Sequence, residues 1–227
     1  MTQRVQCTRM LCCKFPVGRR DTGEGKLNVA KKERTIQAAV GLRVKSGWAT
    51  AVLVVGSVNS PRAISRSVVD LSDEGDPDSR QPYHAVMGLN ENDGPKLLKR
   101  LEKVVERVTN KSVTDLLKDY RNTGSEVRAA GLVVGSTVDP SSIPNDHIRA
   151  HALEGHLFRT ALESALHASG LPFSVVVERE AYSKAVGLLG RSSDDVKQVL
   201  SELGRQVGGP WRSDEKMAAL VAWMALA

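Results

Sequence analysis

Hydrophobic and polar positions define three β-rich runs in the first third of the chain. Residues 35–45 and 48–56 are rich in Val and Ala, and Ser46-Gly47 between them is a tight-turn signal. A third run, residues 62–71, follows after a short loop. Three consecutive strands joined by short turns predict an antiparallel meander.

Helical periodicity follows a polar loop, which we expect over residues 72–94. Apolar residues recur at helical spacing after Pro95, a residue that suits the first turn of a helix. A second, short helix is expected from Ser112, where Asp115 completes an approximate capping box. The pattern therefore predicts two helices between the meander and the next strand.

The second half of the chain alternates strands and helices. Residues 127–135 are apolar without alternation, as in a buried parallel strand. Strand–helix alternation of this kind implies parallel strands with right-handed crossovers. The remaining expected elements are a helix that is opened by residues 144–146 and stops at Gly170, a strand at 173–178, helices at about 181–189 and 193–206, and a last helix from Ser213. The order β-β-β-α-β-α-β-α predicts an α/β fold.

Charge is distributed unevenly along the chain. Residues 1–34 hold nine basic and three acidic side chains, a net charge of +6, whereas the remaining residues hold 23 of each. We expect residues 1–34 to be a basic, disordered tail and residues 35–227 to be a single neutral domain. Such a tail is a candidate contact for nucleic acid.

Cysteine usage and hydropathy indicate the compartment. Cys7, Cys12 and Cys13 all lie in the tail, and their spacing matches no standard zinc pattern. No run approaches the roughly 18 apolar residues of a membrane helix, and the N-terminus lacks the apolar middle of a secretory signal. These features predict a cytoplasmic protein with free thiols.

The order of elements over residues 35–227 resembles that of the RNase H-like superfamily. The segment GLRVKSGWATAVLV (41–54) resembles the first hairpin of an uncharacterised, resolvase-like branch. The segment SDEKMAALVAWMAL (213–226) is similar to the last helix of resolvase-type members. The resemblance implies a three-strand antiparallel meander followed by parallel strands with crossover helices. It also implies hydrolysis of phosphodiester bonds with a divalent metal.

The sequence departs from that superfamily at the metal site. The resemblance implies an Asp on the first strand, where this chain has Arg43, and a second acid one turn into the last helix, where it has Ala218. Asp214 and Glu215 are nearby. A two-metal site needs several convergent carboxylates, so the sequence disfavours a conventional two-metal nuclease.

The helix expected at about 146–169 carries polar residues on its apolar face. At about 100° per residue, His147, His151 and Glu154 fall within the arc that holds Phe158 and Leu162. Buried ionisable groups need partners, and two His four residues apart can share one metal. His147, His151 and Glu154 are therefore candidate ligands for Mg, Mn or Zn, and His151 is also a candidate general acid or base.

The strand before this helix ends at Gly135 and is followed by polar residues. In open α/β sheets, ligands bind beyond the carboxyl ends of the strands. We therefore expect candidate site residues to gather at this edge. The candidates for binding are Arg43, Lys45, Ser136, Thr137, Arg80 and His84, and those for catalysis are His151, Glu154, Asp139 and Glu215.

Alternatives stay open for the helix and for the function. If the helix start projects past the sheet, the His/Glu face meets solvent or a loop such as residues 80–84. Core histidines with satisfied hydrogen bonds are a further alternative. The leading functional hypothesis is a metal-assisted or His-assisted phosphodiester hydrolase. The alternatives are an inactive relative that binds nucleic acid or a protein partner through the tail and the Arg43 edge, and a structural module that forms a homodimer.

Overall fold

The computed structural model describes residues 36–227, which contain one five-stranded sheet. The strand order is β3-β2-β1-β4-β5, with β1, β2 and β3 antiparallel and β1, β4 and β5 parallel. The predicted meander and the two parallel strands are thus confirmed. The strands are β1 (Ile36–Lys45), β2 (Trp48–Ser57), β3 (Ser60–Asp70), β4 (Ser125–Val134) and β5 (Phe173–Val177).

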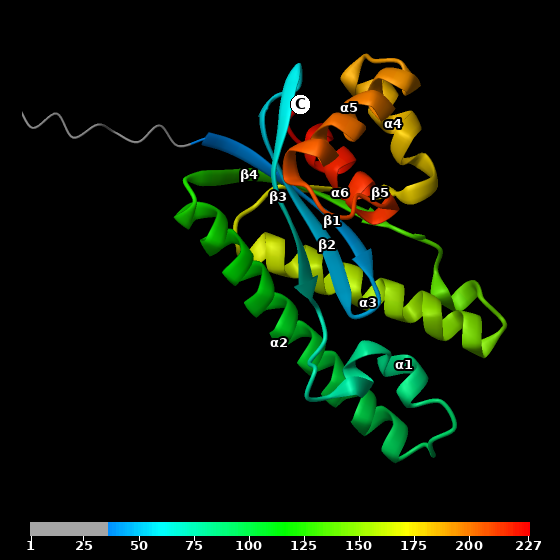
Figure 1. The fold of residues 1–227 in the computed structure, drawn as a ribbon. Coiled ribbons are helices and arrows are strands. Elements are labelled where there is room, and N and C mark those ends of the chain that lie inside the picture. Colours follow the sequence, from blue (N-terminus) through cyan, green and yellow to red (C-terminus); the bar gives the residue numbers. More distant parts are fainter. Residues whose placement is uncertain (1–35) are drawn as a thin grey trace, which may run out of the picture. The chain divides into compact units, whose positions relative to one another are not determined.

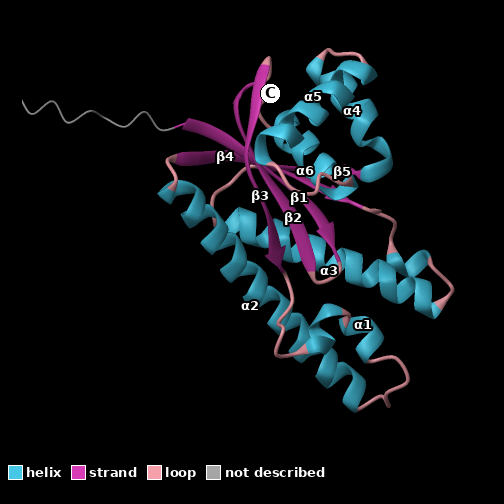
Figure 2. Ribbon diagram, in the orientation of Figure 1, coloured by secondary structure: helices cyan, strands magenta, loops and turns pink. Residues whose placement is uncertain are grey.

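Helices cover both faces of the sheet (Figures 1 and 2). One face packs against α2 (Asp93–Asn122) and α3 (Asp146–Ala168), and the other against α4 (Ala181–Leu189), α5 (Ser193–Val207) and α6 (Ser213–Met224). The short helix α1 (Pro82–Ala85) lies beside α2 and α3. The molecule is therefore a three-layer α/β/α arrangement.

The sheet is buried on both faces because alternate residues of its strands face opposite helical layers. Val40 and Leu42 on β1 belong to the core under α2 and α3, whereas Val52 and Val54 on β2 belong to the core under α4, α5 and α6. All four side chains are at most 1% exposed. Burial on both faces explains why these strands are nearly continuous apolar runs in the sequence.

Helix α6 lies directly on the centre of the sheet because two strands carry glycine beneath it. A Cβ on Gly41 of β1 would lie 1.7 Å from the carbonyl oxygen of Ala218, and one on Gly131 of β4 would lie 2.6 Å from that of Val221. Neither position tolerates a side chain. This close packing holds the start of α6, with Asp214, over the carboxyl end of β1.

The segment between β3 and β4 differs from the sequence prediction. The two helices expected after Pro95 are one continuous 30-residue helix, α2, and Ser112 lies inside it. The predicted loop also contains a 3₁₀ turn, Pro77–Arg80, and helix α1. The two-helix prediction was wrong because the apolar face continues through Val113 and Leu117, both buried, and this packing outweighs a local capping signal.

The predicted basic tail, with Cys7, Cys12 and Cys13, lies outside the described residues, so its proposed role is still a prediction. Among the helices that the structure does describe, none combines the length and the apolar character needed to cross a membrane.

Candidate functional site

Arg43 is buried where the first strand of the sheet ends. It is 4% exposed, and its Nη1 donates to the carbonyl oxygen of Val44 at 2.9 Å. Its guanidinium pairs with Glu178, just after β5, and its Nε lies 3.8 Å from Asp214 Oδ1, at the start of α6. Lys45 also reaches Asp214, with Nζ 3.2 Å from Oδ1. The two acids at this edge are therefore paired with cations.

This arrangement makes a two-metal carboxylate site at the sheet edge untenable. Two close divalent ions need several free carboxylates to clamp them. Here a guanidinium fills the centre and pairs with Glu178 and Asp214. The sequence disfavoured a two-metal site because of Arg43, and the structure places Arg43 where such a site would lie. The pairing of Arg43 with Glu178 was not predicted.

Three histidines meet at the start of α3. His147 and His151 lie one turn apart on α3, and His84 comes from α1. The ring centroids are 4.3 to 4.9 Å apart, and one possible metal-ligating atom of each residue lies within 4.8 Å of the others. We call His84, His147 and His151 the histidine cluster.

A fully buried carboxylate supports the histidine cluster. Glu154 is 0% exposed, and its Oε1 lies 2.7 Å from His84 Nδ1 and accepts from the His84 backbone N–H at 3.3 Å. Its Oε2 lies 3.8 Å from His151 Nδ1 and has no hydrogen-bond partner within residues 36–227. A carboxylate at Nδ1 favours the tautomer in which His84 Nε2 carries the free lone pair.

That free nitrogen is the most informative atom of the site. Nε2 of His84 is buried and makes no hydrogen bond with any residue from 36 to 227. Buried polar atoms normally have partners. An ion held by the histidine cluster would supply one, so the chemistry of the donor set fits a metal.

Helix α1 is fixed beside α3 by polar contacts as well as by packing. Pro82 starts α1 and is buried, and the hydroxyl of the next residue, Tyr83, donates to Glu102 of α2 at 3.0 Å. Burial, with the carboxylates of Glu102 and Glu154, raises the pKa of Tyr83 to about 12, so the phenol keeps its proton. The Tyr83 contact ties α1 to α2, and the contacts of His84 with Glu154 tie it to α3.

A cleft of about 480 Å³ lies between the carboxyl ends of β1 and β4 and the first turns of α3. It is lined by Arg43, Lys45, Ser46 and Ser136 on the strand side and by His151 on the helix side. His151 thus belongs both to the histidine cluster and to the wall of the cleft. The cleft gives a ligand access to one side of the candidate metal site.

Other predicted site residues are engaged locally. Asp139 accepts from the Ser141 N–H at 2.9 Å, a bond that lowers the pKa of Asp139, and Glu215 accepts from the Arg212 N–H at 2.8 Å. Thr137 is exposed and is not part of the lining of the cleft. No contact links these three residues to the histidine cluster, so their roles in a site stay predictions.

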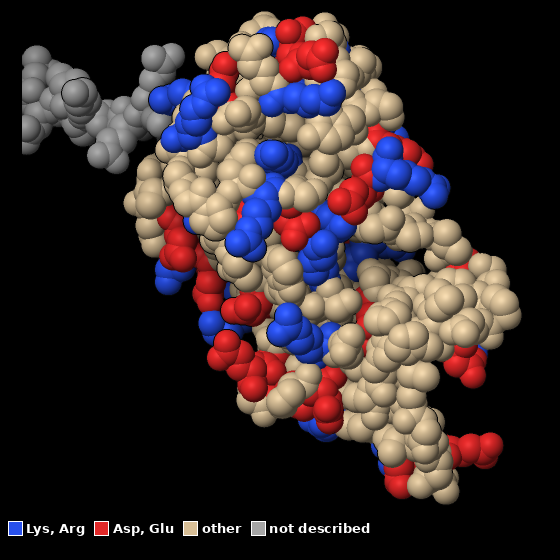
Figure 3. Space-filling view, turned by 45° about the vertical axis from the view of Figure 1, so that its right-hand side comes forward, with Lys and Arg blue, Asp and Glu red and all other residues tan. Residues whose placement is uncertain are grey.

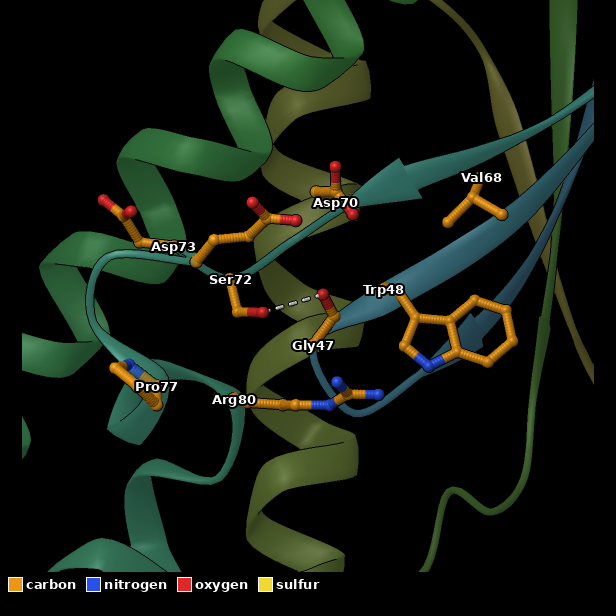
Figure 4. Close-up of a pocket in the computed structure, with 9 residues that line it drawn as sticks. Gly47, Trp48, Val68, Asp70, Ser72, Asp73, Pro77 and Arg80 are labelled. Carbon is orange, nitrogen blue, oxygen red and sulfur yellow. Dashed lines mark hydrogen bonds between the residues drawn. The ribbon is translucent and has the colours of Figure 1, made fainter.

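Arg80 lies in a separate pocket of about 530 Å³ beside the β1–β2 turn (Figure 4). Its side chain runs past Gly47 on the side of Trp48, and Ser72 Oγ donates to the Gly47 carbonyl at 3.0 Å. Trp48 is half-buried in the wall of this pocket. The structure therefore separates Arg80 from His84, although the two are close in sequence.

The start of α3 settles the open question about its polar face. Glu154 points into the protein, whereas His147 and His151 are exposed towards α1 and the cleft. The alternative in which this face meets the 80–84 segment is the arrangement found. The Asn145 side chain accepts from the Ile148 N–H at 3.0 Å, so this N–H at the helix start is not available to an anion.

Comparison with known proteins gives a fold but no family. No protein-family model and no curated protein matches the sequence. Among solved structures, RuvC of Thermus thermophilus in complex with a Holliday junction substrate aligns with a TM-score of 0.50 and 12% identity, over 83% of this chain and 91% of that one. A second structure of RuvC from the same organism aligns with a TM-score of 0.49 and 11% identity, over 82% of this chain and 92% of that one. A member of the Ppx/GppA family from Aquifex aeolicus aligns with a TM-score of 0.35 and 12% identity, over 67% of this chain and 39% of that one.

The chain therefore has the RNase H-like fold, as its sequence predicted, and RuvC in complex with a Holliday junction substrate is among its solved neighbours. At this level of identity the likeness shows the fold alone. The site must be judged on its own residues, which are a buried Arg43 at the sheet edge and a histidine cluster beside a cleft.

Proposed function

We propose that this protein is a zinc-dependent hydrolase of phosphate esters whose metal is held by His84, His147 and His151. The observation that carries the proposal is the buried Nε2 of His84. It has no partner within residues 36–227, the Nδ1 of the same ring is held by the buried carboxylate of Glu154, and the ring lies in a group of three imidazoles.

Ligand chemistry favours zinc over the other ions that the sequence allowed. Magnesium prefers oxygen ligands, whereas imidazole nitrogens suit zinc and related transition metals. Three His ligands that leave a fourth position open are typical of catalytic zinc sites. Glu154 contributes here as the carboxylate behind His84 rather than as a fourth ligand, an arrangement common around zinc-binding histidines.

The histidine cluster needs only a small adjustment to bind an ion. Zinc–nitrogen bonds of about 2.0–2.1 Å in a tetrahedral site place ligand nitrogens about 3.4 Å apart. The ligating atoms now lie within 4.8 Å of one another. Because His147 and His151 are exposed, their side chains can rotate inwards while Glu154 holds His84 in place.

The residues around the cluster suit hydrolysis of a phosphate ester. When bound, zinc lowers the pKa of a coordinated water to about 7 and polarises a phosphoryl oxygen. Lys45 and Arg43 line the adjoining cleft, whereas the acids paired with them, Asp214 and Glu178, do not line it, so the charged groups that face the cleft are basic and favour an anion. In the reaction a water oxygen bonds to phosphorus, the bond to the leaving oxygen breaks, and a proton goes to that leaving oxygen. The RNase H-like neighbour crystallised with a Holliday junction, itself a phosphodiester, makes phosphodiesters the first substrates to test.

The test combines metal binding with hydrolysis. We expect isothermal titration calorimetry to give one zinc ion per chain for the wild type and none for His147→Ala. Hydrolysis of bis(p-nitrophenyl) phosphate should be lost on treatment with a chelator and should return with zinc. The matched control is His167→Ala, an exposed histidine near the end of the same helix, which should bind zinc and turn over like the wild type.

Two results separate the parts of this proposal. Hydrolysis that persists in His147→Ala or in the chelated protein would refute the assigned metal centre. One zinc ion per chain without hydrolysis of any phosphate ester, diester or monoester, would keep the metal site and refute the activity.

A further inference from the structure

Two glycines keep the cleft beside the histidine cluster open. Gly135 follows β4, and Gly155 lies inside α3; both line the cleft. A Cβ at either position would have no atom within 4 Å, so a side chain would meet only open space. Neither glycine has a positive φ, so the backbone does not require glycine at either place.

Gly155 is unfavourable for the helix that contains it. Glycine inside a helix costs about 1 kcal/mol relative to alanine. Packing offers no reason for it, because a methyl group would fit without contact. The remaining structural consequence of glycine here is free volume in the cleft next to His151.

The walls of the cleft show what kind of ligand would fit. Apart from His151, the helix side and the connection before it are apolar, and two of their side chains, Val138 and Ile148, are 53% and 56% exposed. Exposed apolar side chains in a concave site indicate an apolar partner. The strand side carries Lys45, Ser46 and Ser136, which offer a charge and hydroxyl groups. The ligand is therefore apolar on one side and anionic on the other.

Size and charge argue against a nucleic-acid duplex in this cleft. A volume of about 480 Å³ lies within the range of small-molecule sites. Residues 35–227 carry equal numbers of basic and acidic side chains. Figure 3 shows the two signs interspersed over one face of the molecule rather than separated. Binding to duplexes depends mainly on basic contacts with phosphates.

We propose that the cleft binds a small aromatic phosphate ester of nucleotide size. Its ring lies against Val138 and Ile148, and its phosphate faces Lys45 and His151. The inference rests on the proposed function, because it places the phosphate of this ester at the zinc-dependent hydrolase site. It narrows the substrate class from phosphate esters in general to small aromatic ones.

The test uses adenosine monophosphate as the aromatic ester and inorganic phosphate as the ligand without a ring. Both are titrated calorimetrically into the zinc-loaded protein. The key variant is Gly155→Leu, which fills the cleft from α3 without touching the backbone. The matched control is Gly187→Leu, because Gly187 is an exposed glycine inside α4 that also has open space at its Cβ and lies outside the cleft.

We expect adenosine monophosphate to bind at least tenfold more tightly than inorganic phosphate to the wild type and to Gly187→Leu. Gly155→Leu should remove that difference and leave zinc affinity unchanged. Equal affinities of the two ligands for the wild type, or an unchanged difference in Gly155→Leu, would overturn the inference even if zinc binding and hydrolysis are confirmed. Failure of the proposed function would show itself separately, as the absence of zinc binding in the wild type.

Discussion

Replacing Glu154 with Gln tests whether the buried carboxylate holds His84 for a metal. The substitution keeps the size of the side chain and an oxygen that can accept from the His84 N–H groups, but it removes the negative charge. Loss of such an outer carboxylate typically lowers metal affinity by 10- to 100-fold. The variant should therefore fold and bind zinc weakly.

The size of the effect follows from linkage. At a free zinc concentration 100 times the Kd, binding stabilises the wild type by about 2.7 kcal/mol. For a domain of this size that is a rise in Tm of about 5–11 °C. A 10- to 100-fold weaker site at the same zinc concentration gains only about 0.4–1.4 kcal/mol. The zinc-induced rise in Tm of Glu154→Gln should then be about half that of the wild type or less.

The assay is differential scanning calorimetry with and without zinc, with Glu163→Gln as the control. Glu163 lies on the same helix and forms a half-buried pair with Arg159 rather than with the histidine cluster, so its substitution should leave the zinc-induced rise unchanged. Without zinc, Glu154→Gln should cost about 1–2 kcal/mol, because a hydrogen bond to a charged acceptor becomes a neutral one. A full zinc-induced rise in Glu154→Gln would refute the assigned role of the carboxylate.

Three further predictions concern the rest of the fold and use urea unfolding. Gly41→Ala should cost about 3 kcal/mol or more, since its Cβ would lie 1.7 Å from the Ala218 carbonyl oxygen; a loss below about 1 kcal/mol would contradict the close packing of α6. Arg43→Met should lower the free energy of unfolding by about 1–3 kcal/mol, because it removes the cation paired with Glu178. An unchanged free energy of unfolding would mean that this ion pair contributes nothing to stability. The folded-state pKa of Tyr83, about 12, lies above its ordinary value of 10.0, so its contribution to stability is full below pH 10 and is lost as the pH rises towards 12. The free energy of unfolding of the wild type should therefore fall relative to Tyr83→Phe over that range, and parallel profiles would contradict the shift.

The order of strands and helices could be predicted because each strand is buried on both faces and reads as an apolar run. The buried core face of α3 could be predicted from its period as well, since Phe158 and Leu162 are both 0% exposed. The continuity of α2 could not be predicted locally. Ser112 and Asp115 imitate a helix start, and only packing against the sheet shows that the helix runs through them.

Only part of the candidate site could be predicted from the sequence. His147, His151 and Glu154 stood out because they break the apolar face of α3. His84 did not stand out as a ligand, since it lies 63 residues before His147 in a segment without helical periodicity. Its place beside α3 depends on tertiary packing of α1, for which Pro82 is the one local signal. Similarly, Arg43 was recognised as a departure, but its pairing with Glu178 required the parallel position of β5.

X-ray absorption at the zinc edge of the zinc-loaded protein tests the central claim most directly. The histidine cluster predicts about three nitrogen ligands at about 2.0–2.1 Å, with the multiple-scattering pattern of imidazole and one further light ligand. The His84→Ala variant should lose one imidazole from that pattern. A shell made only of oxygens, or a spectrum unchanged in His84→Ala, would contradict the assignment of His84, His147 and His151 as a metal centre.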